Sequence, residues 1–390
     1  MINGQSQASV TQTLQDCVVV GASFAGLACA SALARSGARV VVLERKHDPG
    51  AKLHTTGILV REVVEQVALL DGLPPAYVRR VNGVRLYAPN LCSVDLTAPG
   101  YYFLATDTPQ LMRWLADRTQ ELGAELRWDA GFTAAVRGQG GFDLGPAVGR
   151  TRFLVGADGP KSNVARVLGL GRNSRFLAGI EYEFGGLEIA EPDRLHCFID
   201  KRLMPGYIGW VVQGVGVVQV GLARRLKAPA ATSVKSAMSA FLAKIAPLFP
   251  FQGLRPVSIR AGLIPCGGLV RPCAAPRVVL VGDAAGMVSP VTAGGIHLAL
   301  RHGLATGHAI ADFLSDRRPD PVEELVPNYP TFRAKRVLRL LFDNFQTDLA
   351  FNLMLRTKLV RQAASLIYFH QRGVFEERAD ARAGQRTVSD

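Results

Sequence analysis

The stretch CVVVGASFAGLACASALARSGARVVVLE, Cys17 to Glu44, decides the fold. It begins with an unbroken apolar run of the kind that forms a buried strand in a parallel sheet. Small residues follow and continue as a helix that ends at Gly37, and a second apolar run closes at Glu44. Strand, helix and strand in this order predict a βαβ unit and an α/β fold with a Rossmann-like domain.

The turn after the first strand carries a variant of the dinucleotide-binding fingerprint. In that pattern the first glycine makes the turn, the second lets backbone approach a pyrophosphate, and the third allows close helix–strand packing. Gly21, Ser23 and Gly26 hold these positions, so serine replaces the second glycine. The helix start still offers free N–H groups and a positive dipole end. Glu44, followed by Arg45, stands where an acid binds ribose hydroxyls, which completes the first part of a predicted dinucleotide site.

Two further stretches have the same design, an apolar strand that ends in small residues and an acid. They are FLVGADGPKSNVAR, from Phe153, and VVLVGDAAGMVSPVTAGG, from Val278. An acid at such a place can also do no more than cap the helix that follows. Three strand ends of this kind predict one ligand lying across the carboxyl edge of one sheet. The candidate residues are Asp158, Gly159, Gly282, Asp283, Pro290, Gly294 and Gly295.

Length and composition restrict the class of protein. A chain of 390 residues exceeds the usual size of one core, so we expect two. The net charge of +13 suits an anionic ligand or surface, but the basic residues outside the C-terminal region form no tract with interleaved aromatics, so we expect no nucleic-acid partner. The six cysteines lack CxxC spacing, which predicts no metal site. No apolar run is long enough to span a bilayer and no secretory signal is visible, so we expect a cytoplasmic protein.

Taken in order, the three stretches resemble FAD-dependent oxidoreductases of the para-hydroxybenzoate-hydroxylase-like fold. The resemblance rests on GxSxxG with Glu44, then GADGxxSxxR, then GDAAGxxxPxxAGG. The third motif is more similar to the geranylgeranyl reductase branch than to the aromatic hydroxylases. It implies FAD as cofactor, with Asp283 at the ribityl or ribose part, and Pro290 and the backbone up to Gly295 along the flavin ring. The following helix would then direct its positive end at the N1–C2=O edge of the flavin.

Between the second and third stretches the composition changes to short alternating strands, as in YEFGGL, LHCFID, GYIGWVV and VVQVGLA. This pattern is typical of an antiparallel sheet, which in the family forms the substrate wall. We expect residues 74–104 to join the same layer. The predicted FAD-binding domain comprises residues 16–73, 105–172 and 276–320, and the substrate domain comprises residues 74–104 and 173–275. C-terminal helices are expected at 321–375, with a disordered N-terminus at 1–15 and a disordered tail at 376–390.

Four residues are candidates for substrate contact or catalysis. Tyr207 and Trp210 lie in a run similar to the Tyr-x-Trp-x-Phe-Pro region of prenyl reductases, although the spacing differs and the Phe-Pro pair is missing. His54 lies in KLHTTG, which corresponds to a flavin-facing loop of those enzymes, and an imidazole can donate a proton or orient a substrate. His297 follows the third motif. The alternatives are core aromatics for the first two residues and a solvated or interior histidine for the others.

Two positions in the second half of the predicted FAD-binding domain depart from the family pattern. Thr108 begins a helix that starts with an arginine near the FAD phosphates in many relatives. Arg113, further along the same helix, cannot be assumed to replace that arginine.

The C-terminal region has apolar residues at helical spacing with basic residues among them. It forms either helices packed on the body of the protein or a basic amphipathic surface that rests on anionic lipid and admits a hydrophobic substrate. The basic residues are Arg333, Lys335, Arg336, Arg339, Arg356, Lys358 and Arg361.

These features predict an FAD-dependent oxidoreductase that acts on a hydrophobic or aromatic small molecule, with hydride passing from reduced flavin to an alkene-type acceptor. One alternative is a monooxygenase that uses a C4a-hydroperoxide, and another is a flavin electron carrier. A halogenase is less favoured because the expected Trp-x-Trp pair is absent. No second dinucleotide fingerprint is visible, so NAD(P)H would bind transiently or an electron-donor protein would serve.

Overall fold

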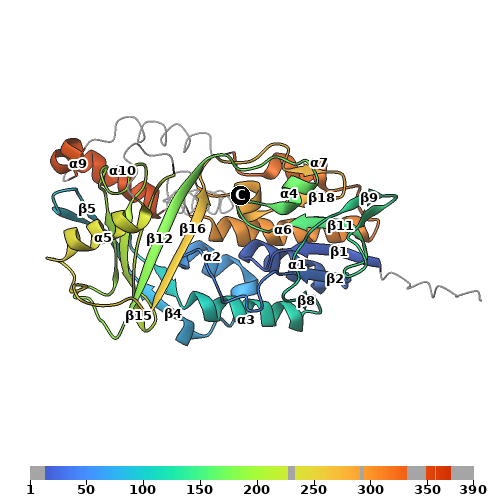
Figure 1. Cartoon of the computed structure of the whole chain (residues 1–390), viewed down its shortest axis with the longest axis horizontal. Coiled ribbons are helices and arrows are strands. Elements are labelled where there is room, and N and C mark those ends of the chain that lie inside the picture. Colours follow the sequence, from blue (N-terminus) through green and yellow to red (C-terminus); the bar gives the residue numbers. More distant parts are fainter. Residues whose placement is uncertain (1–13, 227–232, 290–293, 332–347, 356, 370–390) are drawn as a thin grey trace, which may run out of the picture.

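The computed structural model describes residues 14–226, 233–289, 294–331, 348–355 and 357–369. Their strands form sheets of eight, seven and three strands. Figure 1 shows the eight-stranded sheet with its helices at one end of the long axis and the long strands of the seven-stranded sheet at the other. The expected combination of a Rossmann-like FAD-binding fold with an antiparallel sheet and C-terminal helices is confirmed, while the exact domain limits stay a prediction.

The eight-stranded sheet is parallel at its centre, because β1 pairs in parallel with β2 and β11, and β11 with β18. This order brings the carboxyl ends of β1, β11 and β18 side by side, and these are the three strand ends singled out in the sequence. The strands are β1 (Leu14–Val20), β2 (Val40–Leu43), β8 (Glu125–Arg127), β9 (Val136–Gly138), β10 (Gly141–Asp143), β11 (Arg150–Gly156), β17 (Ala274–Ala275) and β18 (Val278–Leu280).

One limit of the predicted disordered N-terminus is wrong. Leu14 and Gln15 belong to β1, because they pair in register with Arg150 and Thr151 of β11. The rest of that segment, and the tail at 376–390, lie outside the described residues.

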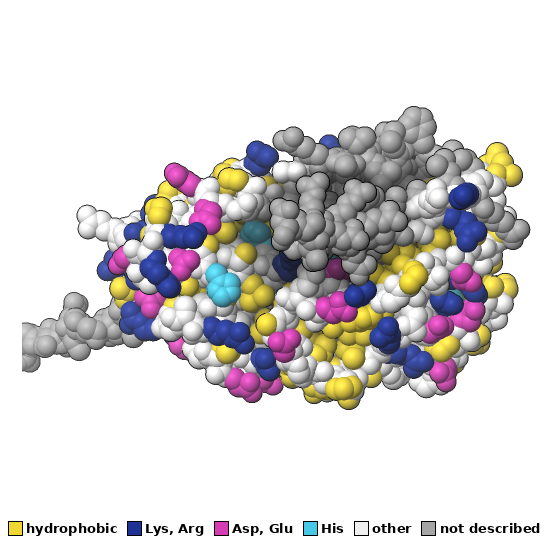
Figure 2. Space-filling model, turned by 180° about the vertical axis from the view of Figure 1, so that it is seen from behind, with side chains coloured by type: hydrophobic (Ala, Val, Ile, Leu, Met, Phe, Trp, Pro, Cys, Tyr) yellow, Lys and Arg dark blue, Asp and Glu magenta, His cyan; other side chains and the backbone are white. Residues whose placement is uncertain are grey.

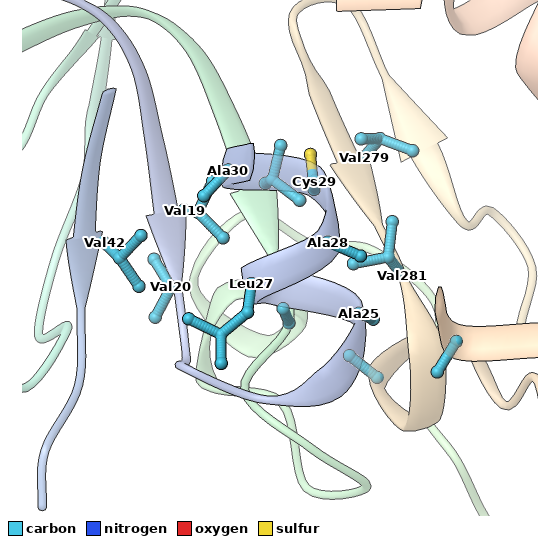
Figure 3. Packing of buried hydrophobic residues seen from close by; sticks show 14 of the residues in the cluster. Val19, Val20, Ala25, Leu27, Ala28, Cys29, Ala30, Val42, Val279 and Val281 are labelled. Carbon is cyan, nitrogen blue, oxygen red and sulfur yellow. The ribbon is translucent and has the colours of Figure 1, made fainter. Parts of the chain in front are cut away.

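Small residues bring the helices of this half into close contact. Helix α1 (Phe24–Arg35) packs against α6 (Ile296–Leu314), and α3 (Thr108–Glu121) lies next to α1. A Cβ on Gly303 would lie 2.5 Å from the main-chain oxygen of Ala25, so α6 approaches α1 at backbone distance. Figure 3 shows side chains of α1 between the valines of β1 and β2 and those of the β18 segment. Short helical elements are α2 (Arg61–Gln66), α4 (Asn163–Val167), α7 (Val322–Leu325), η1 (Ala68–Leu70), η2 (Pro75–Tyr77), η3 (Gly282–Ala285) and η4 (Val326–Asn328).

The seven-stranded sheet has the order β16-β12-β15-β14-β13-β5-β6. Its neighbours are antiparallel except β13 and β5, which are parallel. No hairpin joins these two strands, so nothing in the chain forces them to run in opposite directions. Its strands are β5 (Gly83–Tyr87), β6 (Ser93–Leu96), β12 (Phe176–Gly185), β13 (Arg194–Phe198), β14 (Gly209–Gln213), β15 (Val217–Arg225) and β16 (Ser258–Pro265).

The segment 74–104 divides between two sheets. Its β5 and β6 join the seven-stranded sheet as expected, but β4 (Val78–Val81) and the first half of β7 (Phe103–Thr106) belong to the small sheet. In that sheet β7 lies between β4 and β3 (Ile58–Val60). The prediction was therefore right for only part of the segment. Alternation of apolar and polar residues shows that a strand has one buried face, but it does not show which sheet the strand joins.

The seven-stranded sheet is covered on both faces. Helix α5 (Val234–Ile245) packs on the outer face, where Phe241 and Met238 meet Phe198 and Val220. On the inner face, Leu355 and the C-terminal helix α10 (Lys358–Phe369) form a cluster with residues of β5, β13 and β14. The short helix α9 (Asp348–Met354) precedes α10. No helix among the described residues is long and apolar enough to cross a membrane.

One face of the molecule carries charges of both signs (Figure 2). On the described part of the face in Figure 2, Lys and Arg side chains alternate with Asp and Glu and form no single basic patch.

Candidate active site

The turn between β1 and α1 is built for close approach of backbone. Gly21 has φ of +105°, and a Cβ there would lie 2.5 Å from the oxygen of Ala157. A Cβ on Gly26 would lie only 2.0 Å from the oxygen of Gly21. The Ser23 hydroxyl accepts a hydrogen bond from the Gly26 N–H (3.3 Å) and donates one to the oxygen of Ala157 (3.0 Å). The serine that departs from the fingerprint therefore caps α1 and ties it to the end of β11.

Glu44 is fixed beside this turn. Its Oε2 accepts from the Ala22 N–H (2.9 Å) and its Oε1 from the Lys46 N–H (3.0 Å), and the side chain is buried. Each carboxylate oxygen can accept a further hydrogen bond, so the group can still bind hydroxyls. Arg45 is exposed, so of these two neighbours Glu44 is the one that the fold holds in place.

The two carboxylate oxygens of Asp158, which follows β11, lie in different environments. Its Oδ2 accepts from the N–H groups of Asn163 (2.6 Å) and Val164 (3.1 Å), which is the capping role anticipated as the alternative. Its Oδ1 is buried and has no hydrogen-bond partner among the described residues. The neighbouring Gly159 has φ of +84° and borders open space. One carboxylate oxygen thus remains for a ligand at this strand end.

Asp283 follows β18, inside the turn η3. Its carboxylate has no hydrogen bond or ion pair with the described residues, and burial raises its pKa to about 6. A Cβ on Gly295 would lie 3.7 Å from Asp283 Oδ1, so the carboxylate lies near the start of α6. Gly282, with φ of +59°, packs on Ala25 of α1. The fold thus brings the Gly282–Asp283 turn up to both α1 and the start of α6.

The remaining residues of the third motif are placed only in part. The oxygen of Gly294 accepts from the N–H of Ser289 (3.2 Å), and Gly295 precedes α6. His297 lies in the first turn of α6 and is half-buried. Pro290 lies outside the described residues.

The loop before β3 lies against the inner face of the seven-stranded sheet. His54 is exposed, but its Nδ1 lies 2.6 Å from the oxygen of Ala261, so Nδ1 carries the hydrogen in this contact. A Cβ on Gly262 would lie 2.7 Å from that of His54. The side chain of His54 therefore rests on β16, and a larger residue at position 262 would displace it.

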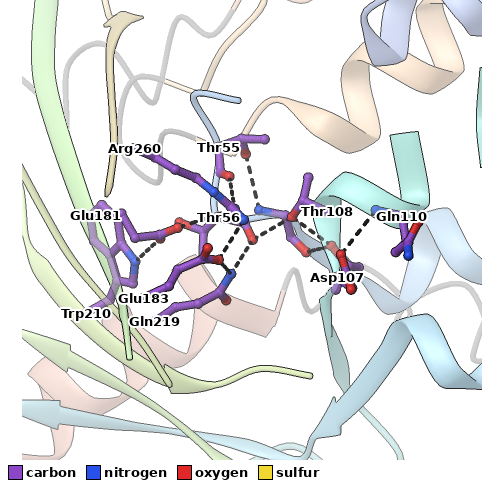
Figure 4. A network of polar contacts seen from close by, with 12 residues as sticks. Thr55, Thr56, Asp107, Thr108, Gln110, Glu181, Glu183, Trp210, Gln219 and Arg260 are labelled. Atoms are coloured by element: carbon purple, nitrogen blue, oxygen red, sulfur yellow. Dashed lines mark hydrogen bonds and ion pairs between the residues drawn. The ribbon is translucent and has the colours of Figure 1, made fainter. Parts of the chain in front are cut away.

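A buried polar network, which sequence reasoning missed, fixes this loop (Figure 4). Glu181 Oε2 accepts hydrogen bonds from the Thr56 hydroxyl (2.5 Å) and from Trp210 Nε1 (3.0 Å). Glu181 pairs in register with Gly221 and Arg260, and Trp210 also pairs with Gly221, so all these residues share the inner face. One carboxyl group therefore joins the loop, through Thr56, to the sheet, through Trp210.

Arg260 and Gln219 extend the network. Arg260 pairs closely with Glu183 (2.6 Å), lies 3.6 Å from Glu181, and donates to the oxygen of Thr55 (3.1 Å). Gln219 Nε2 donates to Glu183 and to the oxygen of Thr56, both at 3.2 Å. The sequence did contain a signal, because EYEF places two acids on one face of a strand whose neighbours are apolar.

Thr108, which stands where many relatives have an arginine, supports the loop from the other side. Its hydroxyl donates to the oxygen of Thr56 (3.0 Å), and Thr106 donates to the oxygen of Gly57 (2.7 Å). Arg113 pairs with Asp48 (2.6 Å). The threonine thus has a role of its own, and Arg113 has a carboxylate partner within the chain.

The inner face beyond the network is apolar. Tyr207 is buried against Leu177 and Ala223, with Ile264 partly buried beside them. The ring of Trp210 lies on Gly221, where an added Cβ would come within 2.2 Å of ring carbons. Tyr207 and Trp210 therefore both pack as core aromatics, the alternative anticipated from the sequence, and their contact with a substrate stays a prediction. The structure joins Trp210, but not Tyr207, to the loop through Glu181.

Neither of two cavities coincides with the three strand ends. One, of about 430 Å³, is lined by residues around Pro272 and Tyr329. The other, of about 270 Å³, lies between the start of α3 and the network, and its lining includes Arg113, Glu183 and Arg260. Among the described residues, no group of three or more His, Cys, Asp or Glu side chains is placed to hold a metal ion.

The site chemistry fits FAD. The glycine turn, the fixed Glu44 and the carboxylate oxygens of Asp158 and Asp283 lie along one sheet edge, and three of those oxygens have no partner among the described residues. Residues 15–341 match the model of the family described as FAD binding domain. The chain belongs to this family. It is an FAD-dependent oxidoreductase, as the resemblance implied.

Similar proteins place it more closely within this family. Digeranylgeranylglycerophospholipid reductase 2 of Methanothermobacter thermautotrophicus is 26% identical over 321 residues, which cover 78% of this chain and 80% of that protein. The protein of the same name from Methanopyrus kandleri is 28% identical over 321 residues, covering 77% of this chain and 78% of that protein. The predicted resemblance to the geranylgeranyl reductase branch is confirmed.

Solved structures show the same fold. A geranylgeranyl bacteriochlorophyll reductase-like protein from Thermoplasma acidophilum superimposes with a TM-score of 0.76 at 18% identity, covering 94% of this chain and 99% of that one. A variant of the halogenase PltM in complex with FAD superimposes with a TM-score of 0.71 at 14% identity, covering 87% of this chain and 78% of that one. At such identities these structures support the fold and not a particular reaction.

Proposed function

We propose that the protein is an FAD-dependent reductase that saturates carbon–carbon double bonds in a hydrophobic chain of the isoprenoid type. The observation that carries this proposal is the apolar inner face around Tyr207 and Trp210, next to the place where the loop 52–57 contacts the sheet. The names of the similar proteins, reductases of geranylgeranyl lipids, support it. An apolar wall favours contact with a hydrocarbon chain and excludes water from the reaction.

The residues of the chain would bind the cofactor in the following way. The turn at Gly21 and Gly26 would receive the pyrophosphate, and Glu44 the adenosine ribose. Asp283 would hold hydroxyls of the ribityl part, and the start of α6 would stabilise negative charge on the flavin. Bound FAD would supply a hydride. Saturation of an alkene also needs a proton, for which His54, Tyr207 and His297 are the candidate donors.

The substrate class can be tested with the FAD-loaded protein under anaerobic conditions. We expect chemically reduced protein to reoxidise when mixed with a digeranylgeranyl glycerolipid, and the product to gain two hydrogens for each double bond. A matched lipid with fully saturated chains should leave the flavin reduced. Reoxidation that requires oxygen and adds an oxygen atom to the substrate would instead establish a hydroxylase.

The electron donor is tested separately. We propose that a nicotinamide or a redox protein binds transiently and reduces the flavin. Direct bleaching of the flavin by NADH or NADPH would identify a nicotinamide as the donor. If neither nicotinamide bleaches the flavin, the donor is a redox protein. If the protein passes electrons between two redox proteins and forms no organic product, it is an electron carrier.

We further propose that the C-terminal helices contact an anionic membrane surface, from which a lipid substrate would enter. On α9, Leu349 and Leu353 lie one turn apart and are 69% and 70% exposed, and Lys358 and Arg361 of α10 are exposed as well. The other basic residues predicted for this surface, Arg333, Lys335, Arg336, Arg339 and Arg356, lie outside the described residues.

Replacement of both leucines, Leu349→Ser with Leu353→Ser, is expected to weaken sedimentation with anionic vesicles by about tenfold, because two side chains lose their apolar burial. The matched control is Leu248→Ser with Leu254→Ser, two leucines that are 40% and 46% exposed on the substrate half. Equal binding by both double variants, or by neutral vesicles, would contradict this contact.

A further inference from the structure

Two buried carboxyl groups share one cation on the inner face of β12. Glu181 and Glu183 are 4% and 7% exposed, and Arg260 lies between them with its side chain 9% exposed. The guanidinium is much closer to Glu183, at 2.6 Å, than to Glu181, at 3.6 Å. If both carboxyls were ionised, a surplus negative charge would be buried, which is costly in a medium of low polarity. One bound proton removes that cost.

Of the two carboxyl groups, Glu181 is the one whose contacts favour binding of this proton. Glu183 has the close contact with Arg260 and also accepts from Gln219. Glu181 Oε1 is buried and has no hydrogen-bond partner among the described residues, although Oε2 accepts two hydrogen bonds. Burial raises the pKa of Glu181, and the contacts with Thr56, Arg260 and Trp210 oppose that rise only in part.

Other charged groups lie near this pair. Asp107 and Arg113 line the cavity of about 270 Å³ together with Glu183 and Arg260. Glu183 lies on the same strand and Arg260 on the neighbouring β16, while the loop that donates through Thr56 also carries His54. From β14 and β15 the network receives only Trp210 and Gln219, neither of which titrates.

We infer that Glu181 is a positioning residue that keeps its proton to a higher pH than an exposed glutamate and joins the loop 52–57 to Trp210 of the substrate wall. Loss of this proton strengthens the hydrogen bonds from Thr56 and Trp210, because they become bonds to a charge, and draws Arg260 away from Glu183. The protonation state of Glu181 therefore sets how the wall aromatic and the loop face each other. This inference does not depend on the identity of the substrate.

Trp210 itself provides the readout. In FAD-loaded protein with Trp114→Phe and Trp128→Phe, Trp210 is the only tryptophan. We expect its fluorescence to change with pH, with a midpoint above 4.5, the ordinary value for a glutamate. Glu181→Gln keeps the size and an acceptor for both hydrogen bonds but cannot titrate, so the change should disappear. Persistence of the same change in Glu181→Gln would overturn the assignment.

Two further variants give the sign of the effect and do not remove Glu181. Glu183→Gln removes a like charge and frees Arg260 to pair with Glu181, so the midpoint should fall. Thr56→Ala removes a hydrogen bond that stabilises the carboxylate, so the midpoint should rise. Shifts in the opposite directions would overturn the inference even if Glu181→Gln did not fold. Failure of the alkene assay would leave this titration unchanged, so the two proposals fail separately.

Discussion

Replacement of Asp283 by alanine is expected to weaken FAD binding by roughly ten- to a hundredfold, the loss of one or two hydrogen bonds to a carboxylate. The protein should still fold, because the carboxylate has no partner among the described residues that the change would leave unpaired. Titration of FAD into the FAD-free protein, followed by flavin fluorescence, measures the change. Asp117→Ala, at an exposed position on α3, is the matched control. Full FAD occupancy in Asp283→Ala would remove Asp283 from the cofactor site.

The same substitution should stabilise the FAD-free protein at high pH. The pKa of Asp283 is about 6 in the folded chain and 3.8 in its unperturbed state. Because the folded value is the higher one, the stability associated with this group is fully present below about pH 4 and is lost as the pH rises through 6. Above pH 6 the folded protein bears the cost of an ionised buried carboxylate, up to about 3 kcal/mol for a difference of about two units.

Urea unfolding of both FAD-free proteins at pH 4 and pH 8 tests this expectation. Asp283→Ala should be the more stable protein at pH 8, and the advantage should disappear at pH 4. A purely structural aspartate would give the opposite result, a loss of stability at pH 8. If Asp283→Ala both binds FAD more weakly and is more stable without FAD, then Asp283 serves to bind the cofactor and not to stabilise the fold.

Gly26→Ala is expected to have the largest effect on the fold. Alanine in a helix normally stabilises it relative to glycine by about 1 kcal/mol. Here the added Cβ would lie 2.0 Å from the Gly21 oxygen and 3.1 Å from the Cβ of Ala157, so α1 must move away from the turn. We expect the free energy of unfolding to fall by about 3 kcal/mol, as for overpacking at a rigid site, and FAD to be lost with the turn.

Urea unfolding and FAD occupancy measure the result. The matched control is Gly138→Ala, because an added Cβ there meets nothing within 4 Å and its φ is not positive. That variant should stay within about 0.5 kcal/mol of the unchanged protein. If Gly26→Ala were as stable as the control, the contact between α1 and the turn would not be as close as the structure shows.

The FAD-binding half of the protein could be predicted from the sequence because its elements follow from local patterns of residues. The run Cys17–Glu44 shows its strand, helix and strand within 28 residues, and each of the other strand ends carries its small residues and acid next to the strand. The ordering of β1, β11 and β18 in one parallel sheet then brings these ends together. The individual cofactor residues remain predictions, although the geometry of Asp158 and Asp283 fits them.

The catalytic candidates were harder to judge, since a loop histidine or a strand aromatic has no partner in its own segment. His54 rests on Ala261 and Gly262, more than 200 residues away in the chain. Trp210 reaches Thr56 only through Glu181, which sequence reasoning had not considered. These contacts join three separate segments, and no spacing within one of them indicates the others.

The sequence by itself determined the βαβ unit and the three strand ends, because each depends on residue types at fixed short separations. The FAD cofactor and the family branch were implied by its resemblance to a known family. Tertiary structure alone decided that 74–104 divides between two sheets, that Thr108 supports the loop 52–57, and that Glu181 and Glu183 share Arg260. The physical reason is that a strand pattern specifies which face is buried, whereas the partner of a buried charge is specified only when distant strands pair in register.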